Sequence, residues 1–405
     1  SSLHKTRGKL SLTSLLSSHI FTHHLFHTTM MNSSLRVVRE SETEESDGKN
    51  TGGSSIPVVA IVLIVVFLAV FFIALFFLLR LGLLHFRRRR PTVSSSDSAR
   101  YKSALDALMK LNFADAVGGW RAFDKDVSQR NVAKAAYQAS HHLVTVGAVH
   151  AVLVKETQIR IPCLGMLLNG NFMKDCPELV AGSAPPDEAR GTLLLEALLR
   201  MQIKAVVQLT GAKEAGLWCY YPADCKDKSL RKLSLNGSHV CVSALLGSTE
   251  SRRFLSVKVR RKTESKRRSD STVIDHFHFK EWADCKMPAS RTDISDMAFV
   301  VFHRYVEKKR RVFVHCNSGI GRTGSFVLAL MTLRQIAGDA DSEAITPASL
   351  VEIAKNIRHS RYEAIQSASQ FMYGLLLAAA VVAKSAGRAE ETEVKEWLEQ
   401  LDGQF

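Results

Sequence analysis

The pattern of apolar and polar positions divides the chain into one long apolar run and a later region of alternating helix and strand patterns. Residues 56–79 (IPVVAIVLIVVFLAVFFIALFFLL) contain no charged side chain. In a helix this run extends about 36 Å, enough to cross the roughly 30 Å hydrocarbon core of a bilayer. A cleavable signal peptide would have a shorter apolar core and a small-residue cleavage site. The run therefore predicts a transmembrane helix and excludes a fully soluble protein.

The periodicity after the apolar run predicts a single α/β domain. Apolar positions recur with the helical period in some segments and alternate or run continuously in short strand-like segments between them. The predicted strands are 205–210, 254–260 and 312–315, and the predicted helices are 189–204, 293–309, 322–336, 346 onward and 367–384. Thr346 and Pro347 suit the N-cap and first turn of their helix. A charged tail, 385–405, predicts one amphipathic helix.

The charges beside the apolar run predict its orientation. Residues 40–47 are rich in Glu and Asp, whereas Arg80 and the arginine run 87–90 follow the apolar segment. Because Lys and Arg collect on the cytoplasmic side of a membrane, the C-terminal part is predicted to be cytoplasmic. The arginine run can also hold anionic lipid headgroups. Which membrane carries the protein stays open.

These signals predict five regions. An extracytoplasmic segment covers 1–55, the transmembrane helix 56–79, a basic juxtamembrane linker 80–100, the α/β domain 101–384 and a charged tail 385–405. The chain begins with Ser1, and Met30 and Met31 follow a stretch without clear pattern. We hypothesise that translation starts at one of these two methionines, so that 1–29 is not translated.

Composition restricts the partners and the compartment. The chain has 405 residues, a formal net charge of +15, and a dense basic cluster over 252–268. No aromatic residues alternate with these charges and no nucleic-acid-binding motif is present, so the cluster favours acidic membranes or acidic substrates over nucleic acid. The seven cysteines form no CxxC pair and no disulfide framework, which favours a reducing compartment without a structural zinc site.

The segment 312–326 (VFVHCNSGIGRTGSF) carries the strongest chemical signal. A short apolar strand leads to Cys316, a turn containing two glycines follows, and a helix begins near Arg322. Backbone N–H groups of such a turn converge on an anion, and Arg322 can hold two phosphate oxygens at once. The same positive surroundings favour the nucleophilic thiolate of Cys316. A buried structural cysteine is the plainer interpretation, but it does not explain this combination of residue types and spacings.

HCNSGIGRT (315–323) resembles the HCx5R(S/T) phosphate-binding loop of the protein tyrosine phosphatases. Further segments are similar to the family in its order over about residues 120–380. They are Asn131, Lys134 and Tyr137 of a phosphotyrosine loop, 169–171 (NGN), 206–222 (VVQLTGAKEAGLWCYYP), the acid loop 282–288 (WADCKMP) and 358–370 (RHSRYEAIQSASQ). The resemblance implies a single phosphatase domain with a central twisted mixed sheet flanked by helices, and neither a metal nor a cofactor.

The resemblance also implies roles for individual residues. Cys316 would attack phosphorus, Arg322 would stabilise the phosphoryl oxygens, and Asp284 would protonate the leaving phenolate. Gln366 would position the hydrolytic water, and Thr323 would ease departure of the sulfur. The remaining predicted site residues support the loop or the substrate: His315, Glu214, Tyr137, Gln370, and the loop residues Asn317, Ser318, Gly319, Ile320 and Gly321.

Some positions depart from the family pattern, and three functions stay open. Ala283 replaces the usual proline of the acid loop, Ala136 breaks the phosphotyrosine loop pattern, and Ala139 replaces an aspartate that binds the substrate backbone. The leading hypothesis is a single-pass membrane protein tyrosine phosphatase acting on phosphotyrosine-containing proteins. The alternatives are a phosphoinositide phosphatase at the membrane surface and a phosphotyrosine-binding pseudophosphatase.

Overall fold

The structure is a computed structural model that falls into two units, 1–81 and 82–405, each described here by itself. It describes residues 62, 65–76, 91–129, 143–146, 149–152, 154, 156–161, 166–211, 214, 231–235, 238–245, 254–262, 271–284, 286–288, 290–338 and 345–403. The first unit contributes the short apolar helix Val65–Phe76, in which every residue is exposed. Of the described helices, Ala368–Ala386 has the length and hydropathy of a membrane span, but 78% of it is buried inside the second unit.

A mixed sheet of nine strands forms the centre of the second unit, with the order β3-β4-β5-β11-β6-β10-β9-β8-β7. Strand β11 is parallel to both of its neighbours, β5 and β6, and β6 is parallel to β10. The other pairs are antiparallel. The strands are β3 Gln158–Ile161, β4 Met166–Met173, β5 Cys176–Ser183, β6 Ala205–Gln208, β7 Arg231–Leu235, β8 Ser238–Leu245, β9 Phe254–Lys262, β10 Ser271–His278 and β11 Val312–Cys316. A separate hairpin pairs β1 Leu143–Val146 with β2 Val149–Val152.

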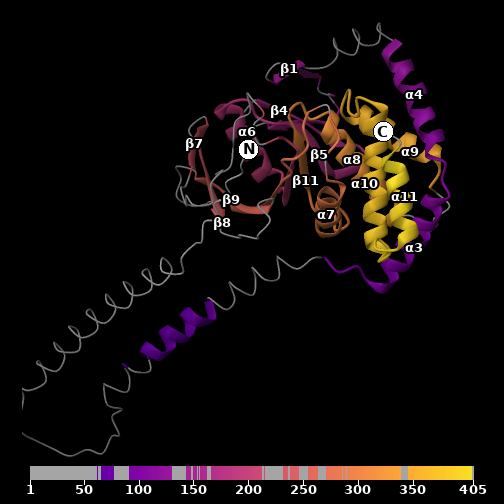
Figure 1. The fold of residues 1–405 in the computed structure, drawn as a ribbon. Coiled ribbons are helices and arrows are strands. Elements are labelled where there is room, and N and C mark those ends of the chain that lie inside the picture. Colours follow the sequence, from indigo (N-terminus) through magenta and orange to yellow (C-terminus); the bar gives the residue numbers. More distant parts are fainter. Residues whose placement is uncertain are drawn as a thin grey trace, which may run out of the picture. The chain divides into compact units, whose positions relative to one another are not determined.

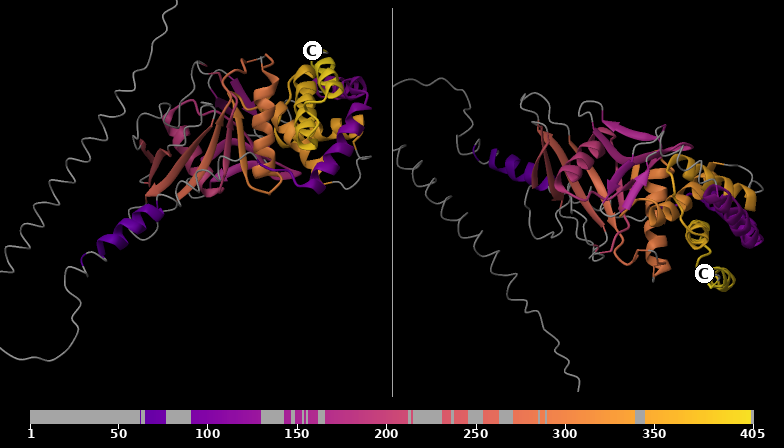
Figure 2. Two further views of the ribbon diagram at one scale, coloured as in Figure 1. Left: turned by 60° about the horizontal axis from the view of Figure 1, so that its bottom comes forward. Right: turned by 90° about the horizontal axis from the view of Figure 1, so that it is seen from above.

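Helices cover the sheet (Figure 1). They are α3 Ser95–Met109, α4 Phe113–Gln129, α6 Glu188–Arg200, α7 Arg291–Val301 with a π-helical turn Phe302–Val306, α8 Gly321–Gly338, α9 Pro347–Ser360, α10 Ala368–Ala386 and α11 Thr392–Asp402. Helix α6 packs on β4, β7, β8 and β9, whereas α8 packs on β5 and β11. Two further views show the twist of the sheet and the C-terminal helices gathered to one side of it (Figure 2).

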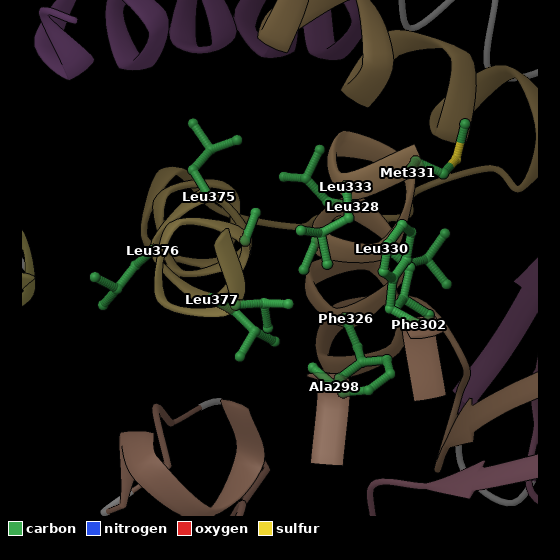
Figure 3. Close-up of a cluster of buried hydrophobic side chains, with 14 of the residues drawn as sticks. Ala298, Phe302, Phe326, Leu328, Leu330, Met331, Leu333, Leu375, Leu376 and Leu377 are labelled. Atoms are coloured by element: carbon green, nitrogen blue, oxygen red, sulfur yellow. The ribbon is translucent and has the colours of Figure 1, made fainter. Parts of the chain in front are cut away.

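The larger core lies between α8, α10 and the sheet. Leu377 of α10 points toward α8, whereas Leu376 points to the opposite side, and Phe302 and Ala298 lie close to Phe326 (Figure 3). A second, smaller core joins α6 to the opposite face of the sheet around Phe313 and Ile274. Because β11 is buried on both faces, its sequence is apolar except for His315, as expected of a central parallel strand.

The strands and helices that the sequence predicts are found near their predicted positions, but β1–β5, β7, β8, β10, α3 and α4 were not predicted. Thr346 caps α9 in a reciprocal capping box, with Pro347 in its first turn, and β11 and α8 lie where the apolar pattern predicts them. The helix predicted over 293–309 begins at Arg291 but changes to a π-helical turn at Phe302. Helix α3 begins at Ser95, inside the predicted linker 80–100, because the Ser94 side chain accepts a hydrogen bond from the Asp97 amide and caps the helix.

Candidate active site

Strand β11 lies in the middle of the sheet, and Cys316 is its last residue, at the C-terminal ends of the parallel strands. In the register, Cys316 pairs with Ser183 of β5, and His315 pairs with Gly182. The C-terminal ends of parallel strands are where open α/β sheets place their ligands. Cys316 is only 2% exposed, so the thiol lies at the bottom of the site rather than on the surface.

The turn after Cys316 folds tightly over the sulfur. The Gly319 amide donates a hydrogen bond to Cys316 Sγ at 3.2 Å. Gly319 has a φ of +74°, and a Cβ there would lie 2.0 Å from the Gly182 carbonyl oxygen. Only glycine fits such a left-handed position in so close an approach. The turn leads directly into α8, and the N-terminus of a helix is a position that favours a bound anion.

Arg322, in the first turn of α8, lies against two carboxylates. Its Nη1 binds Glu214 Oε1 and donates to the Trp282 carbonyl at 2.8 Å, while its Nη2 donates to Glu214 Oε2 at 3.0 Å. Burial alone would lower the pKa of Arg322, but the hydrogen bonds to Glu214 and the nearby negative groups together raise it. Arg322 Nε is buried without a hydrogen-bond partner among the described residues, which leaves a donor for a ligand.

The acid-loop residue Asp284 reaches the same guanidinium. Its Oδ1 lies 3.0 Å from Arg322 Nη2, although the Asp284 side chain is 63% exposed. Trp282 anchors the loop from inside: it is fully buried, donates from Nε1 to the Lys286 carbonyl at 2.7 Å, and packs edge-on against Tyr373. The loop is therefore anchored by the buried Trp282, and its exposed Asp284 carboxylate lies within reach of the site.

Two glutamines border the start of α8. A Cβ on Gly321 would lie 2.8 Å from Gln366 Oε1 and 2.7 Å from Gln370 Nε2, so both side chains lie against this glycine. The backbone N–H of Gln366 donates a hydrogen bond to Gln370 Oε1 at 2.7 Å. Gln366 is exposed beside the loop, where a side-chain amide can reach water next to a phosphoryl group.

Arg361 holds the loop from behind. Its Nε donates to the Gly319 carbonyl at 2.5 Å and its Nη2 to the Ser318 carbonyl at 2.9 Å. The same guanidinium binds Asn169 and Asn171 of β4 and Ser183 of β5. The sequence pattern places Arg361 in a family-like segment without indicating this role. The one local signal is its position directly after α9, whose end packs near the loop.

His315 is completely buried, and its Nδ1 lies 3.2 Å from the Cys316 carbonyl oxygen. Burial lowers the pKa of His315 to about 3, so the ring is neutral at physiological pH. It therefore contacts the turn as a neutral ring. Thr323 Oγ1 is buried and has no hydrogen-bond partner among the described residues, the Cys316 sulfur included.

The structure brings most of the predicted site residues together around Cys316 and Arg322. Asn317 and Ser318 are half-buried, and Gly319, Ile320 and Gly321 are buried within the loop. Tyr137, with Ala136 and Ala139, lies outside the described residues. Among the described residues, no group of three or more His, Cys, Asp and Glu side chains could hold a metal ion.

Comparison with known proteins gives the family. The family model described as "Protein-tyrosine phosphatase" matches residues 169–380, just over half of the chain. The chain belongs to the protein-tyrosine phosphatase family, and the sheet, the loop and the acid loop described above form its phosphatase domain.

Individual relatives are distant. A segment is 29% identical over 107 residues to tyrosine-protein phosphatase 1 of Schizosaccharomyces pombe, covering 25% of this chain and 18% of that protein. Another is 28% identical over 110 residues to receptor-type tyrosine-protein phosphatase N2 of Mus musculus, covering 26% of this chain and 10% of that protein. The match thus spans less than a fifth of the length of these two relatives.

Solved structures share the fold. The tyrosine phosphatase TcPTP1 of Trypanosoma cruzi superposes with a TM-score of 0.52 at 19% identity, covering 72% of this chain and 97% of that one. TbPTP1 of Trypanosoma brucei gives a TM-score of 0.50 at 18% identity, with 71% and 98% covered. At these identities the likeness supports the fold alone.

Proposed function

We propose that the chain is a membrane-anchored protein tyrosine phosphatase that hydrolyses phosphotyrosine in proteins through a cysteinyl-phosphate. The observation that carries the proposal is the convergence of three groups. The Cys316 sulfur accepts a hydrogen bond from the loop amide of Gly319, and Arg322 is bound to both Glu214 and the acid-loop residue Asp284. A nucleophile, a phosphate-binding cation and a proton donor are the groups that phosphoryl transfer through a thiolate requires.

The first half of the reaction forms the S–P bond. The Cys316 thiolate attacks phosphorus, the P–O bond to the tyrosine ring breaks, and Asp284 gives its proton to the departing phenolate oxygen. Arg322 and the loop amides stabilise the equatorial oxygens, where negative charge is held throughout the transfer. Glu214 keeps the guanidinium in register through its two hydrogen bonds.

The second half breaks the S–P bond. Gln366 positions a water molecule beside phosphorus, Asp284 accepts a proton from it, and inorganic phosphate leaves as the Cys316 thiolate returns. The buried hydroxyl of Thr323, unpaired among the described residues, can turn toward the sulfur at this stage.

We further propose that residues 56–79 anchor the protein in a membrane, with the phosphatase domain in the cytoplasm. In support, the helix Val65–Phe76 exposes apolar side chains all round; Phe67 is 70% exposed. Such a surface is unfavourable in water and favourable in lipid. The proposal keeps the predicted regions 1–55 as outer segment, 80–100 as basic juxtamembrane linker, 101–384 as phosphatase domain and 385–405 as charged C-terminal tail.

The activity test offers the purified full chain three substrates: a phosphotyrosine peptide, a phosphoserine peptide and phosphoinositide micelles. Release of phosphate from phosphotyrosine alone, abolished in Cys316→Ser, is the expected result. Preference for the lipid would instead support the phosphoinositide phosphatase. Binding of phosphotyrosine without turnover would identify a pseudophosphatase.

The anchoring test is independent of activity. Membranes from cells that express the chain are washed with alkaline carbonate and then treated with protease from the cytoplasmic side. The full chain is expected to stay with the membrane and to lose its phosphatase domain to protease. Release by carbonate would contradict the span, and protection of the domain would contradict its orientation. Val66→Arg with Ile73→Arg is expected to abolish retention, because charges at the centre of a span oppose insertion.

A further inference from the structure

Arg361 is a buried cation whose described partners are all neutral. Its side chain is 0% exposed, and its guanidinium donates to two loop carbonyls, two asparagine side chains and the Ser183 hydroxyl. Among the described residues, no carboxylate forms an ion pair with it. The other two buried arginines near the site differ, since Arg322 pairs with Glu214 and Arg358 pairs with Asp124 at 2.5 Å.

The hydrogen bonds of Arg361 set the direction of the loop amides. In a trans peptide the C=O and the N–H of the next residue point in opposite directions. Because Arg361 holds the Ser318 carbonyl outward at 2.9 Å, the Gly319 amide points inward, where it meets the Cys316 sulfur at 3.2 Å. Arg361 also binds the Gly319 carbonyl, so the next amide in the chain is turned inward as well.

The charge of Arg361 has a second consequence. Burying a charge without a counter-ion costs free energy, and a negative charge close to it lowers that cost. Burial lowers the pKa of Arg361 to about 10, and the negative charge of Cys316 opposes that change. Arg361 therefore stays protonated at neutral pH, and the two negative groups that can compensate it are the Cys316 thiolate and a bound phosphate.

We propose that Arg361 is a second cation of the phosphate site, acting from behind the loop: its unneutralised charge favours both the Cys316 thiolate and the binding of phosphate. The inference rests on the proposed phosphatase function, and it adds a positioning residue to that site. Arg361 touches the outer carbonyls of the loop rather than the reacting atoms, so its effect passes through the loop and through space.

Asn169 offers a direct way to neutralise Arg361 in place. Its Oδ1 accepts from Arg361 Nη2 at 3.2 Å, and its buried Nδ2 has no hydrogen-bond partner among the described residues. Asn169→Asp therefore keeps the acceptor and the shape, loses none of the described hydrogen bonds, and places a negative charge against the guanidinium. Arg334→Gln is the matched control, because it makes the same change in net charge on α8 at a residue that is 32% exposed and paired with Glu178.

Two measurements on the full chain test the inference without using turnover. The first is the rate of Cys316 alkylation by iodoacetamide across pH, followed by mass spectrometry of the loop peptide. The second is the affinity for inorganic phosphate. In Asn169→Asp the pH at which the alkylation rate is half-maximal is expected to rise by about one unit. The affinity for inorganic phosphate is expected to fall about ten-fold, the usual scale for one neighbouring charge. Arg334→Gln is expected to match the wild-type chain in both.

Unchanged alkylation and phosphate affinity in a folded Asn169→Asp chain would overturn the inference. If that variant does not fold, Arg361→Lys and Arg361→Gln decide instead, since lysine keeps the charge but lacks the planar fork. The midpoint is expected to stay near wild type in the lysine variant and to rise in the glutamine variant. Equal shifts in both would assign Arg361 a structural role only. A wild-type chain that does not hydrolyse phosphotyrosine would refute the proposed function while leaving both readouts intact.

Discussion

Arg322 Nη2 lies 3.0 Å from Asp284 Oδ1, although Arg322 is 2% and Asp284 63% exposed. The residue proposed to bind phosphate and the residue proposed to donate the proton are thus already in contact. Glu214 holds the same guanidinium from the other side. An incoming phosphate must share or displace the Asp284 carboxylate at Nη2.

Replacing Asp284 tests its role as the proton donor. Asp284→Ala is expected to lower turnover of a phosphotyrosine peptide by about 10²–10⁴-fold, the usual scale for a general acid. Peptide binding is expected to remain, because Arg322 and the loop amides are unchanged. Steady-state kinetics of the full chain measure both, with Lys280→Ala, an exposed residue before the loop, as control. Unchanged turnover in Asp284→Ala would remove this residue from the mechanism.

Replacing Arg322 tests its proposed role in binding phosphate. Lysine keeps the positive charge but offers a single ammonium, which cannot hold Glu214, the Trp282 carbonyl and a phosphate at once. Arg322→Lys is therefore expected to be nearly inactive and to lose affinity for inorganic phosphate. Activity close to that of the wild-type chain would show that the loop binds phosphate in another way.

The local parts of the site could be predicted from sequence because short segments encode them. An apolar strand, two glycines and a helix start are consecutive in 312–326, and they fold into β11, the turn and α8 as the pattern indicates. Glu214 was also predicted to belong to the site, but only through resemblance, since 108 positions separate it from Arg322.

The role of Arg361 could not be predicted in this way. Its partners Asn169, Asn171 and Ser183 lie on β4 and β5, more than 170 positions earlier in the chain. Only the register of β5 beside β11 brings them next to the loop. Likewise, composition gave no sign that α3 would begin inside the predicted linker, because that start depends on a single serine cap.

Glu214 is expected to act by holding Arg322. Glu214→Gln keeps one acceptor but removes the charge and one of the two hydrogen bonds to the guanidinium. A charge-assisted hydrogen bond contributes about 1.5–3 kcal/mol, which corresponds to roughly a 10–150-fold loss in kcat/KM. Glu188→Gln, at the exposed start of α6, is the matched control. A kcat/KM equal to that of the wild-type chain would show that Arg322 keeps its position without Glu214.

Gly319 is expected to tolerate no side chain. In Gly319→Ala the new Cβ would lie 2.0 Å from the Gly182 carbonyl oxygen and 2.8 Å from Arg361 Nη2, at a positive φ. Because neither neighbour can retreat without opening the loop, phosphate binding should be lost and the melting temperature should fall. Gly338→Ala, where nothing lies within 4 Å of the added carbon, serves as control. Phosphate affinity in Gly319→Ala equal to that of the wild-type chain would contradict the loop geometry.

Three buried histidines around the site predict how stability depends on pH. Burial lowers the pKa of His315 to about 3, that of His278 to about 4, and that of His276 well below its usual value. In the unfolded chain these rings titrate near 6.5. Between about pH 6.5 and 4 the unfolded state therefore binds protons that the folded state does not, and the free energy of unfolding falls as the pH falls.

The contribution of His278 to this dependence of stability on pH can be measured separately. Each histidine contributes at most about 1.4 kcal/mol per pH unit within its window. His278 Nε2 hydrogen-bonds to the Thr210 carbonyl at 3.0 Å, and a glutamine amide can donate to the same oxygen without titrating. Urea unfolding of the full chain is expected to show that the free energy of unfolding falls steeply from pH 7 to pH 5. In His278→Gln this dependence on pH should be weaker by the contribution of about one proton. An unchanged slope in His278→Gln would mean that His278 is protonated in the folded protein and that its burial does not keep the ring neutral.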